Sequence, residues 1–235
     1  MINNMIILAY HSISPNVYKD SFFPLSVTPK QFEDQLQYLL KKGYRCVDPN
    51  QIGRESDKKD KRFLITFDDG YADNYVYAYP IMKKLNCTGI IFMVYNKISY
   101  NNDKGVNDPE ISSYLNEDQI RELLDNNIRF GSHTLNHPHL SELTIEEQEN
   151  EIINSKLNLE KHFKIKVDHF CAPYGDFPMT SYTIAKEHYG YCHLTYSYKS
   201  IYKNNRDVLS RFGVYRQNTE LVFKLKLQRD RLRII

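Results

Sequence analysis

The sequence predicts an α/β protein with a parallel sheet, either closed into a barrel or left open. Short apolar runs typical of buried strands alternate along the chain with segments of helical periodicity. No linker, internal repeat or low-complexity tract interrupts this alternation across the 235 residues. One unbroken domain spanning residues 1–235 is therefore expected.

The first half of the chain opens with a compact apolar strand, Met5–Tyr10. Thr28 is predicted to cap a helix that has Pro29 in its first position and ends before Gly43. A charged surface loop is expected at residues 53–62. The other expected elements of this half are a short strand at 45–47, strands at 63–67 and 89–94, and a helix at 75–85.

The second half begins with a polar segment rich in Gly, Pro and Asn, residues 96–113, which predicts an insertion loop. Asn116 is predicted to cap the next helix, and Thr144 with Glu147 forms a capping box that opens the longest helix. The remaining expected elements are strands at 128–132, 169–172, 192–196 and 208–214, a helix near 180–189, and a basic C-terminal helix.

The charge balance argues against a dedicated nucleic-acid binder. Lysine and arginine total 31 against 29 acidic residues, whereas such proteins usually carry a basic face. Only the C-terminal segment, FKLKLQRDRLRII, has a clear excess, with five basic residues and one aspartate. A weak contact with a membrane surface is one interpretation of this segment, and a solvated helix is the other.

The cysteines and the N-terminal sequence indicate the compartment. Cys46, Cys87, Cys171 and Cys192 are scattered without CxxC spacing. This pattern favours reduced thiols over a disulfide framework or a zinc knuckle. The N-terminal sequence has only a short apolar run and no basic leader. A cytoplasmic location is therefore expected.

Polar residues follow the carboxyl ends of four predicted strands. Asp68 and Asp69 come directly after the strand at 63–67, in FLITFDDGYADN, and His11 follows the first strand. The stretches SHTLNHPH and PYGD follow two later strands. In parallel α/β folds ligands bind at this edge of the sheet. These side chains are therefore expected to converge on one site.

The stretch GSHTLNHPHL supplies two histidines, His133 and His137, with metal-ligand spacing. That spacing places both imidazoles on one side of a turn, and Pro138 favours a turn over a helix interior. With one aspartate they would form a His2Asp set with open positions, typical of a hydrolytic zinc site. The alternatives are histidines of a polar loop and an aspartate pair that favours a helix dipole, for which one aspartate would suffice.

Three motifs extend this pattern: TFDDG at 66–70, HTLNHPHL at 133–140 and APYGD at 172–176. In order and approximate spacing the chain resembles the polysaccharide deacetylase family, the NodB-homology enzymes of carbohydrate esterase family 4. The resemblance runs from Leu8 to Arg216. It implies a distorted (β/α) barrel with about seven parallel strands. It also implies hydrolysis of an N-acetyl group on an amino sugar, which releases acetate.

The resemblance assigns roles to the two aspartates and two histidines. Asp68 corresponds to the family's general base. Asp69, His133 and His137 correspond to the ligands of a divalent ion, with zinc expected. Adjacent strand residues point in different directions, so one carboxylate can ligate while its neighbour reaches the water molecule that attacks.

Three further residues are assigned roles, one in catalysis by stabilising the oxyanion and two in substrate binding. In the family a backbone N–H at the position of Tyr174 stabilises the oxyanion, and Pro173 precedes it in the same motif. His11 lies in AYHSI, which is similar to stretches in the branch related to exopolysaccharide deacetylases. We expect Pro173 and His11 to contact the sugar, and a structural role for His11 is the alternative.

The chain departs from the family pattern in two places. The arginine that opens the third motif and orients the base is replaced by Cys171. Arg211, in LSRFGV, is the candidate substitute. On the last strand of a closed barrel it could pair with Asp68, and the alternative is a solvated surface arginine. The late LxH motif that supplies a general acid is absent, so that role is unassigned.

The leading hypothesis is metal-dependent deacetylation of an N-acetylated sugar in a polysaccharide or its precursor. One alternative is deacylation of a lipid-linked or nucleotide-linked sugar at the inner face of a membrane. Another is a catalytically silent sugar-binding module, suggested by the two missing motif residues. The intact base and metal ligands argue against a silent module, because a pure binder has no use for a general base.

Overall fold

The computed structural model describes residues 5–15, 23–53, 60–98, 114–195, 205 and 207–234. The charged loop predicted at 53–62 and the insertion loop predicted at 96–113 lie mostly outside these residues. Where the predicted insertion loop begins, the described residues form a short 3₁₀ turn, η4 (Tyr95–Lys97).

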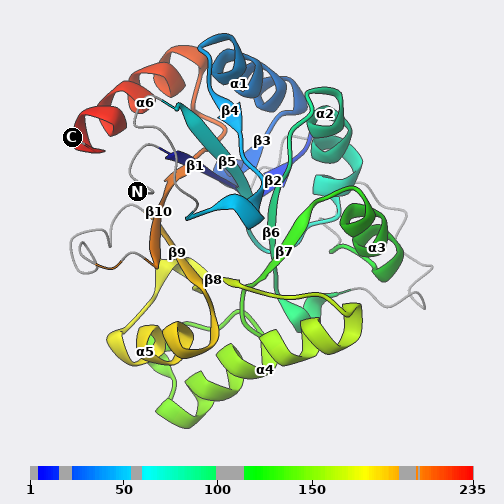
Figure 1. The fold of residues 1–235 in the computed structure, drawn as a ribbon, viewed down its shortest axis with the longest axis vertical. Coiled ribbons are helices and arrows are strands. Elements are labelled where there is room, and N and C mark those ends of the chain that lie inside the picture. The colour runs from blue at the N-terminus through cyan, green and yellow to red at the C-terminus, as the bar shows by residue number, and fades with distance from the viewer. Residues whose placement is uncertain are drawn as a thin grey trace.

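Seven parallel strands close into a barrel at the centre of the molecule (Figure 1). Strand β1 hydrogen-bonds to β10 on one side and to β5 on the other, which completes the ring. The predicted distorted (β/α) barrel is therefore confirmed. The barrel strands are β1 (Met5–Tyr10), β5 (Arg62–Phe67), β6 (Gly89–Met93), β7 (Arg129–Ser132), β8 (His169–Cys171), β9 (Tyr191–Thr195) and β10 (Val208–Gly213).

In the described part of the chain, three short strands lie outside the ring. Strand β4 (Arg45–Cys46) pairs with the start of β5. Strands β2 (Ser12–Ile13) and β3 (Ser26–Val27) pair with each other in a separate sheet. Since β2 follows β1 after a single residue, this small sheet lies at the carboxyl end of the barrel strands.

Helices surround the barrel, as repeated βα units require (Figure 1). The three caps predicted from the sequence form complete capping boxes, in which Thr28, Asn116 and Thr144 accept from the N–H of the third helical residue. The helices are α1 (Pro29–Lys41), α2 (Tyr79–Lys84), α3 (Glu117–Asp125), α4 (Ile145–Phe163), α5 (Met179–His188) and α6 (Glu220–Ile234).

The helix predicted at 75–85 begins differently from an ordinary α-helix. Asn74–Ala78 forms a π-helical turn, η3, before the α-helical part α2. Pro80 has no N–H with which to bond the carbonyl of Val76. The wider turn therefore falls where the regular helical ladder would have lacked a hydrogen bond.

Strand side chains alternate between two cores. Ile7, Leu64 and Phe92 belong to a cluster that fills the barrel, whereas their neighbours Leu8 and Ile65 pack in the larger core against the helices. Both faces of β1 and β5 are consequently buried along their whole length. This double burial explains why the strands appear in the sequence as continuous apolar runs.

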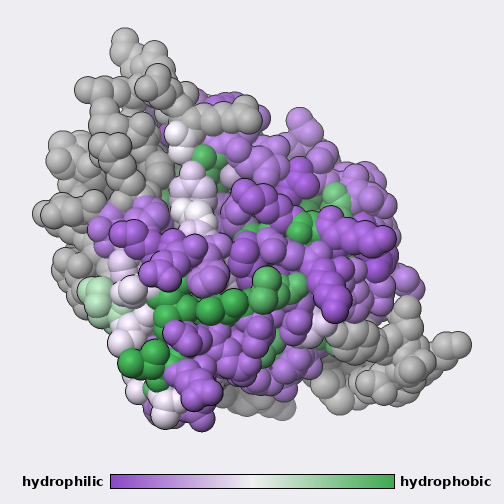
Figure 2. All heavy atoms as spheres, turned by 60° about the horizontal axis from the view of Figure 1, so that its bottom comes forward, coloured by the Kyte–Doolittle hydropathy of each residue, from purple (hydrophilic) through white to green (hydrophobic). Residues whose placement is uncertain are grey.

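The outer surface is mostly hydrophilic on the side that carries α4 and α5 (Figure 2). A narrow hydrophobic band crosses this side, and its helices expose Ile145, Leu157 and Met179. Among the described residues, no helix has both the length and the apolar character needed to cross a bilayer.

Candidate active site

Two aspartates leave the end of β5 in different directions. The N–H of Asp68 donates to the carbonyl of Tyr10 at 2.9 Å, so the pairing with β1 continues past β5. Asp69 (φ 72°) and Gly70 (φ 77°) then adopt left-handed conformations. A Cβ at position 70 would come within 2.7 Å of the Met93 sulfur, which favours glycine there. The carboxylates diverge because of this turn, and the expected strand alternation is not the cause.

Asp69, His133 and His137 converge on one point. Nε2 of His137 lies 3.1 Å, and Nε2 of His133 3.5 Å, from Oδ1 of Asp69. One ligand atom from each of the three residues lies within 4.8 Å of the others. Nδ1 of His133 donates to the carbonyl of Cys171 at 2.7 Å, which leaves the lone pair of Nε2 free for a ligand. Two imidazoles and a carboxylate are ligands of catalytic zinc, so these residues fit such an ion.

Hydrogen bonds to two side chains, one in the loop itself and one on α4, hold the loop that carries His137. Thr134 (φ 71°) and His137 (φ 64°) are left-handed, and the N–H of His137 donates to Oγ1 of Thr134 at 3.0 Å. Glu151 of α4 is 7% exposed and accepts 2.9 Å hydrogen bonds from the N–H groups of Leu135 and Asn136. The turn predicted around His137 is confirmed, whereas the anchoring role of Glu151 has no signal in the sequence analysis.

Arg211 reaches Asp68 from two strands away. Its Nη1 and Nη2 donate to Oδ1 and Oδ2 of Asp68 at 2.6 and 2.8 Å. Nη2 also donates to Sγ of Cys171 at 2.9 Å, and Nη1 donates to Oγ1 of Thr66 at 3.2 Å. The expected pairing with Asp68 is therefore present. Arg211 is 1% exposed, so the alternative of a solvated surface arginine is wrong.

Both aspartates are ionised in this setting. Burial opposes ionisation of Asp68, but the charge and hydrogen bonds of Arg211 outweigh it, and the pKa of Asp68 lies below its usual value. Burial likewise opposes ionisation of Asp69, but the close approach of His133 and His137 holds its pKa well below the usual range. Each carboxylate therefore keeps its charge by a different set of contacts.

The three residues assigned to oxyanion stabilisation and substrate binding lie around this centre. Nε2 of His11 is 3.8 Å from Oδ2 of Asp68, and the His11 side chain is 23% exposed. Tyr174 is exposed, and its ring packs edge-on against His137 with centroids 4.5 Å apart. Pro173 is buried at the start of the 3₁₀ turn η6 (Pro173–Gly175). The structure thus brings all the predicted site residues to the same end of the barrel.

Aromatic side chains beside the centre include two that the sequence analysis did not single out. Tyr71 and Tyr114 stack with centroids 5.4 Å apart, and a backbone bridge joins them. Tyr71 directly follows the DDG turn, so its position was a usable signal, whereas Tyr114 is distant in the sequence. His139 stacks on Tyr174 with centroids 4.0 Å apart. His139 therefore packs on the aromatic ring that also contacts His137.

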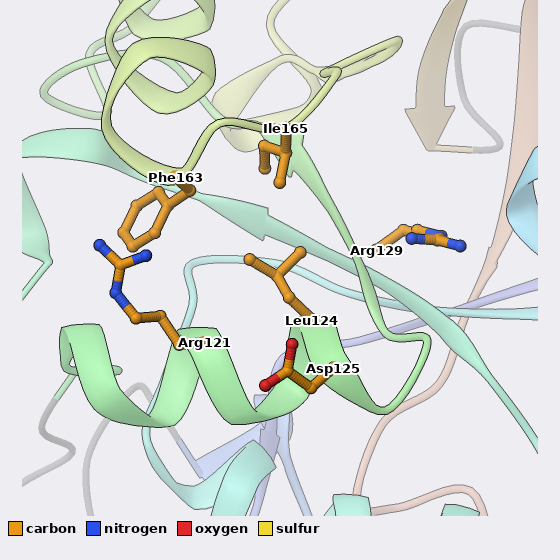
Figure 3. Close-up of a pocket in the computed structure, with 6 residues that line it drawn as sticks. All are labelled: Arg121, Leu124, Asp125, Arg129, Phe163 and Ile165. Atoms are coloured by element: carbon orange, nitrogen blue, oxygen red, sulfur yellow. The ribbon is translucent and has the colours of Figure 1, made fainter.

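A separate hollow of about 460 Å³ lies between α3 and the end of α4 (Figure 3). Arg129 begins β7 whereas His133 follows its end, so the hollow and the cluster of Asp69, His133 and His137 lie at opposite ends of that strand. The side chain of Arg129 extends away from the other five lining residues (Figure 3). The hollow is not part of the candidate active site. Its lining residues are Arg121, Leu124, Asp125, Arg129, Phe163 and Ile165.

The fold and the centre define a class of protein: a parallel (β/α) barrel with a cluster of one aspartate and two histidines and a buried Asp–Arg pair at its carboxyl end. The sequence pattern of the family described as polysaccharide deacetylase matches residues 55–191, which is more than half of the chain. The chain belongs to the polysaccharide deacetylase family.

Individual relatives agree with this assignment. YxkH of Bacillus subtilis (strain 168), named as a polysaccharide deacetylase, is 34% identical over 175 residues, covering 73% of this chain and 57% of YxkH. The chain therefore spans little more than half of that relative. The deacetylase PplD of Streptococcus pyogenes, solved in complex with acetate, superimposes with a TM-score of 0.77 at 24% identity, covering 94% of this chain and 97% of PplD. IcaB from Ammonifex degensii gives a TM-score of 0.74 at 20% identity, covering 95% and 96%. At these identities the two structures support the fold alone.

Proposed function

We propose that this protein is a metal-dependent N-deacetylase that hydrolyses the N-acetyl group of an amino sugar, in a polysaccharide or its precursor, and releases acetate. Membership of the polysaccharide deacetylase family supports the reaction class. The observation that carries the proposal is the separation of two adjacent carboxylates. Asp69 faces two histidines, whereas Asp68 is held by Arg211. One carboxylate is thus placed to ligate and the other to accept a proton.

Asp68 is proposed as the general base. Arg211 binds both of its carboxylate oxygens, which keeps the group ionised and fixes its orientation. Each oxygen keeps a second lone pair that can take a proton from the attacking water. An arginine partner also makes a carboxylate a weaker base, so its benefit lies in holding the base in one productive position.

Asp69, His133 and His137 are proposed to hold the divalent ion, and zinc is the ion proposed because two of the three ligands are imidazoles. Such an ion would supply Lewis-acid activation of water and of the amide carbonyl. The protein contributes the orientation of the ligands. The Cys171 carbonyl fixes the His133 ring, and Glu151 holds the loop before His137.

The sugar is proposed to bind beside Asp68 and Tyr174. The backbone N–H of Tyr174 would stabilise the oxyanion that forms when water attacks the amide. His11, 3.8 Å from the base and partly exposed, would bind a polar group of the sugar. Pro173 is buried, so its proposed contribution is to fix the backbone that presents Tyr174 instead of offering a surface to the sugar.

The direct test is acetate release from N-acetylated sugars by protein reconstituted with zinc. We expect acetate and a free amine in equal amounts from at least one oligosaccharide of N-acetylglucosamine or a related precursor. Protein stripped with a chelator and the Asp68→Asn variant with zinc are the controls, and in both acetate release should fall by at least about 100-fold. Full zinc occupancy together with sugar binding, but without acetate from any substrate, would establish the silent binding module instead.

A lipid-linked sugar is the second candidate substrate, favoured by the exposed face of α6. Leu221 and Leu225 are 66% and 55% exposed there, and the segment is rich in basic residues. Cosedimentation with vesicles that contain an anionic lipid tests for the weak membrane contact that this substrate requires. The cytoplasmic location and the single domain over residues 1–235 remain predictions from the sequence.

A further inference from the structure

Two histidines that the proposed reaction does not use lie buried in the barrel. Nδ1 of His169, on β8, is 3.0 Å from Nε2 of His193, on β9. The side chains belong to residues that are 6% and 1% exposed. Burial lowers the pKa of His169 to about 4 and holds that of His193 well below its usual value. Both rings are therefore neutral near pH 7, and one donates a hydrogen bond to the other.

The strand register places His193 beside the anchor of Arg211. His193 is the direct partner of Cys171 on β8 and of Leu209 on β10. Arg211 lies two residues beyond Leu209, on the same face of β10. Its Nη2 contacts Sγ of Cys171 at 2.9 Å. The Arg211 side chain therefore runs from β10 to β8 across the strand that carries His193.

Phe92 supports both groups from one side. The guanidinium carbon of Arg211 lies 5.4 Å from the centroid of the Phe92 ring, and the His193 ring packs edge-on against Phe92 with centroids 4.9 Å apart. One aromatic ring thus contacts the arginine and the imidazole together. This shared contact confines His193 and Arg211 to the same small region of the barrel.

Two buried polar atoms in this region have complementary hydrogen-bonding properties. Among the described residues, neither Nε of Arg211 nor Nδ1 of His193 has a hydrogen-bond partner, and both atoms are buried. The Arg211 Nε–H can only donate, whereas a neutral imidazole nitrogen can accept or donate. Buried polar groups in native proteins are almost always paired, directly or through water.

We propose that His193 is a positioning residue for Arg211, linked to it by one buried water that accepts from the Arg211 Nε–H and hydrogen-bonds to Nδ1 of His193. The proposal rests on the proposed function, since it explains how the arginine that orients the base is itself oriented. The Nη1 and Nη2 groups of Arg211 already bind Asp68, Thr66 and Cys171. A further contact at Nε holds the side of the guanidinium that these bonds leave free, and His169 fixes the His193 ring in turn.

The kinetic test compares three single variants with zinc bound. His193→Phe keeps an aromatic ring beside Phe92 and removes the nitrogen. We expect kcat to fall about tenfold, with KM changed less than twofold and zinc content unchanged, because the displacement acts on the base and not on binding. His193→Gln, whose amide can bond the same water, should recover part of the loss. His162→Phe, on the outer helix α4, is the control and should match the wild type.

A double-mutant cycle separates positioning from general damage to the core. In an Arg211→Lys background there is no Nε–H to hold, so His193→Phe should lower kcat no further. Equal fold-losses in both backgrounds would mean that His193 acts only through stability, and would overturn the proposal. An unchanged kcat in both His193 variants would overturn it as well.

A spectroscopic test needs no activity. In protein with ¹⁵N-labelled arginine, the Arg211 Nε–H signal is assigned by its loss in Arg211→Lys. We expect it to exchange slowly with solvent in the wild type and to shift in His193→Phe. A high-resolution crystal structure should place the water between the two nitrogens. Rapid exchange in the wild type, or a crystal structure without that water, would overturn the proposal even if the variants do not fold. A wild type with these signatures but no deacetylase activity contradicts the proposed function alone.

Discussion

Replacing Glu151 with alanine should loosen the loop that carries His137, although Glu151 is not a metal ligand. Its Oε2 accepts from the N–H groups of Leu135 and Asn136 at 2.9 Å, and its Oε1 accepts from Nδ2 of Asn136 at 2.5 Å. Glu151→Ala removes all three hydrogen bonds and leaves the buried N–H of Leu135 without its partner. The left-handed residues of the loop then lose the contact that holds them.

The magnitude follows from the number and kind of bonds. A hydrogen bond to a charged group contributes about 1.5–3 kcal/mol to stability, and water entering the site recovers part of the loss. We therefore expect the free energy of unfolding to fall by about 3–5 kcal/mol. For a chain of this length that corresponds to a melting temperature lower by about 10 °C. Zinc affinity should fall roughly 10–100-fold, the usual effect of losing a group that orients a ligand.

Calorimetry on metal-free protein gives the stability, and competition with a chromophoric chelator gives the zinc affinity. Glu151→Gln is the matched variant, since its amide oxygen can still accept from the backbone. Glu149→Ala, at an exposed position of the same helix, is the control and should leave both quantities unchanged. If Glu151→Ala binds zinc as tightly as the wild type, the loop does not depend on this anchor and the reasoning is refuted.

Three further predictions concern the aspartates and their partners. Asp68→Asn should keep one zinc per chain while acetate release falls roughly 10²–10⁴-fold; zinc loss in step with activity would mean that the roles of the aspartates are reversed. Arg211→Ala should lower kcat while zinc content is retained. Because the Asp68 carboxylate is then buried and unpaired, the free energy of unfolding should fall by about 3–5 kcal/mol. A free energy of unfolding equal to that of the wild type would contradict this. Burial raises the pKa of Asp73 to about 7, although a hydrogen bond from Ser12 opposes the rise. At pH values between the unfolded pKa near 4 and the folded pKa, the native state binds more protons at Asp73 than the unfolded chain does. The free energy of unfolding therefore falls as the pH rises through this range. Asp73→Asn should therefore gain stability relative to the wild type by about 2.7 kcal/mol from pH 5 to pH 8, since each pH unit between pH 5 and the folded pKa contributes about 1.36 kcal/mol. A stability difference that does not change with pH in urea denaturation would rule this out.

The strands and helix starts are predictable because their signals are local. Thr144 and Glu147 lie on the same helical turn, and the apolar run of β5 needs only its own residues to mark it as buried. The π-helical turn before α2 and the left-handed backbone of Asp69 could not be predicted from the neighbouring residues in the sequence. A positive φ at a residue other than glycine costs energy, and only surrounding contacts decide whether that cost is met.

The sequence by itself determined the chemistry available at the site. The DDG turn supplies two carboxylates, and the spacing of His133 and His137 supplies two imidazoles on one turn. These groups are close in the chain or follow strands whose ends must meet in a parallel barrel. The candidate metal ligands and the candidate base could therefore be named before the fold was known.

Only the tertiary structure decided how Asp68 is held. Cys171 stands where the family has an arginine, and Arg211 occupies the space beside it from a strand 40 residues later. That meeting depends on closure of the barrel through β10, β1 and β5, which no local pattern encodes. A buried guanidinium is stable only when its charge and its donors are matched. Arg211 could thus be distinguished from a surface arginine only once Asp68, Cys171 and the closed ring were placed together.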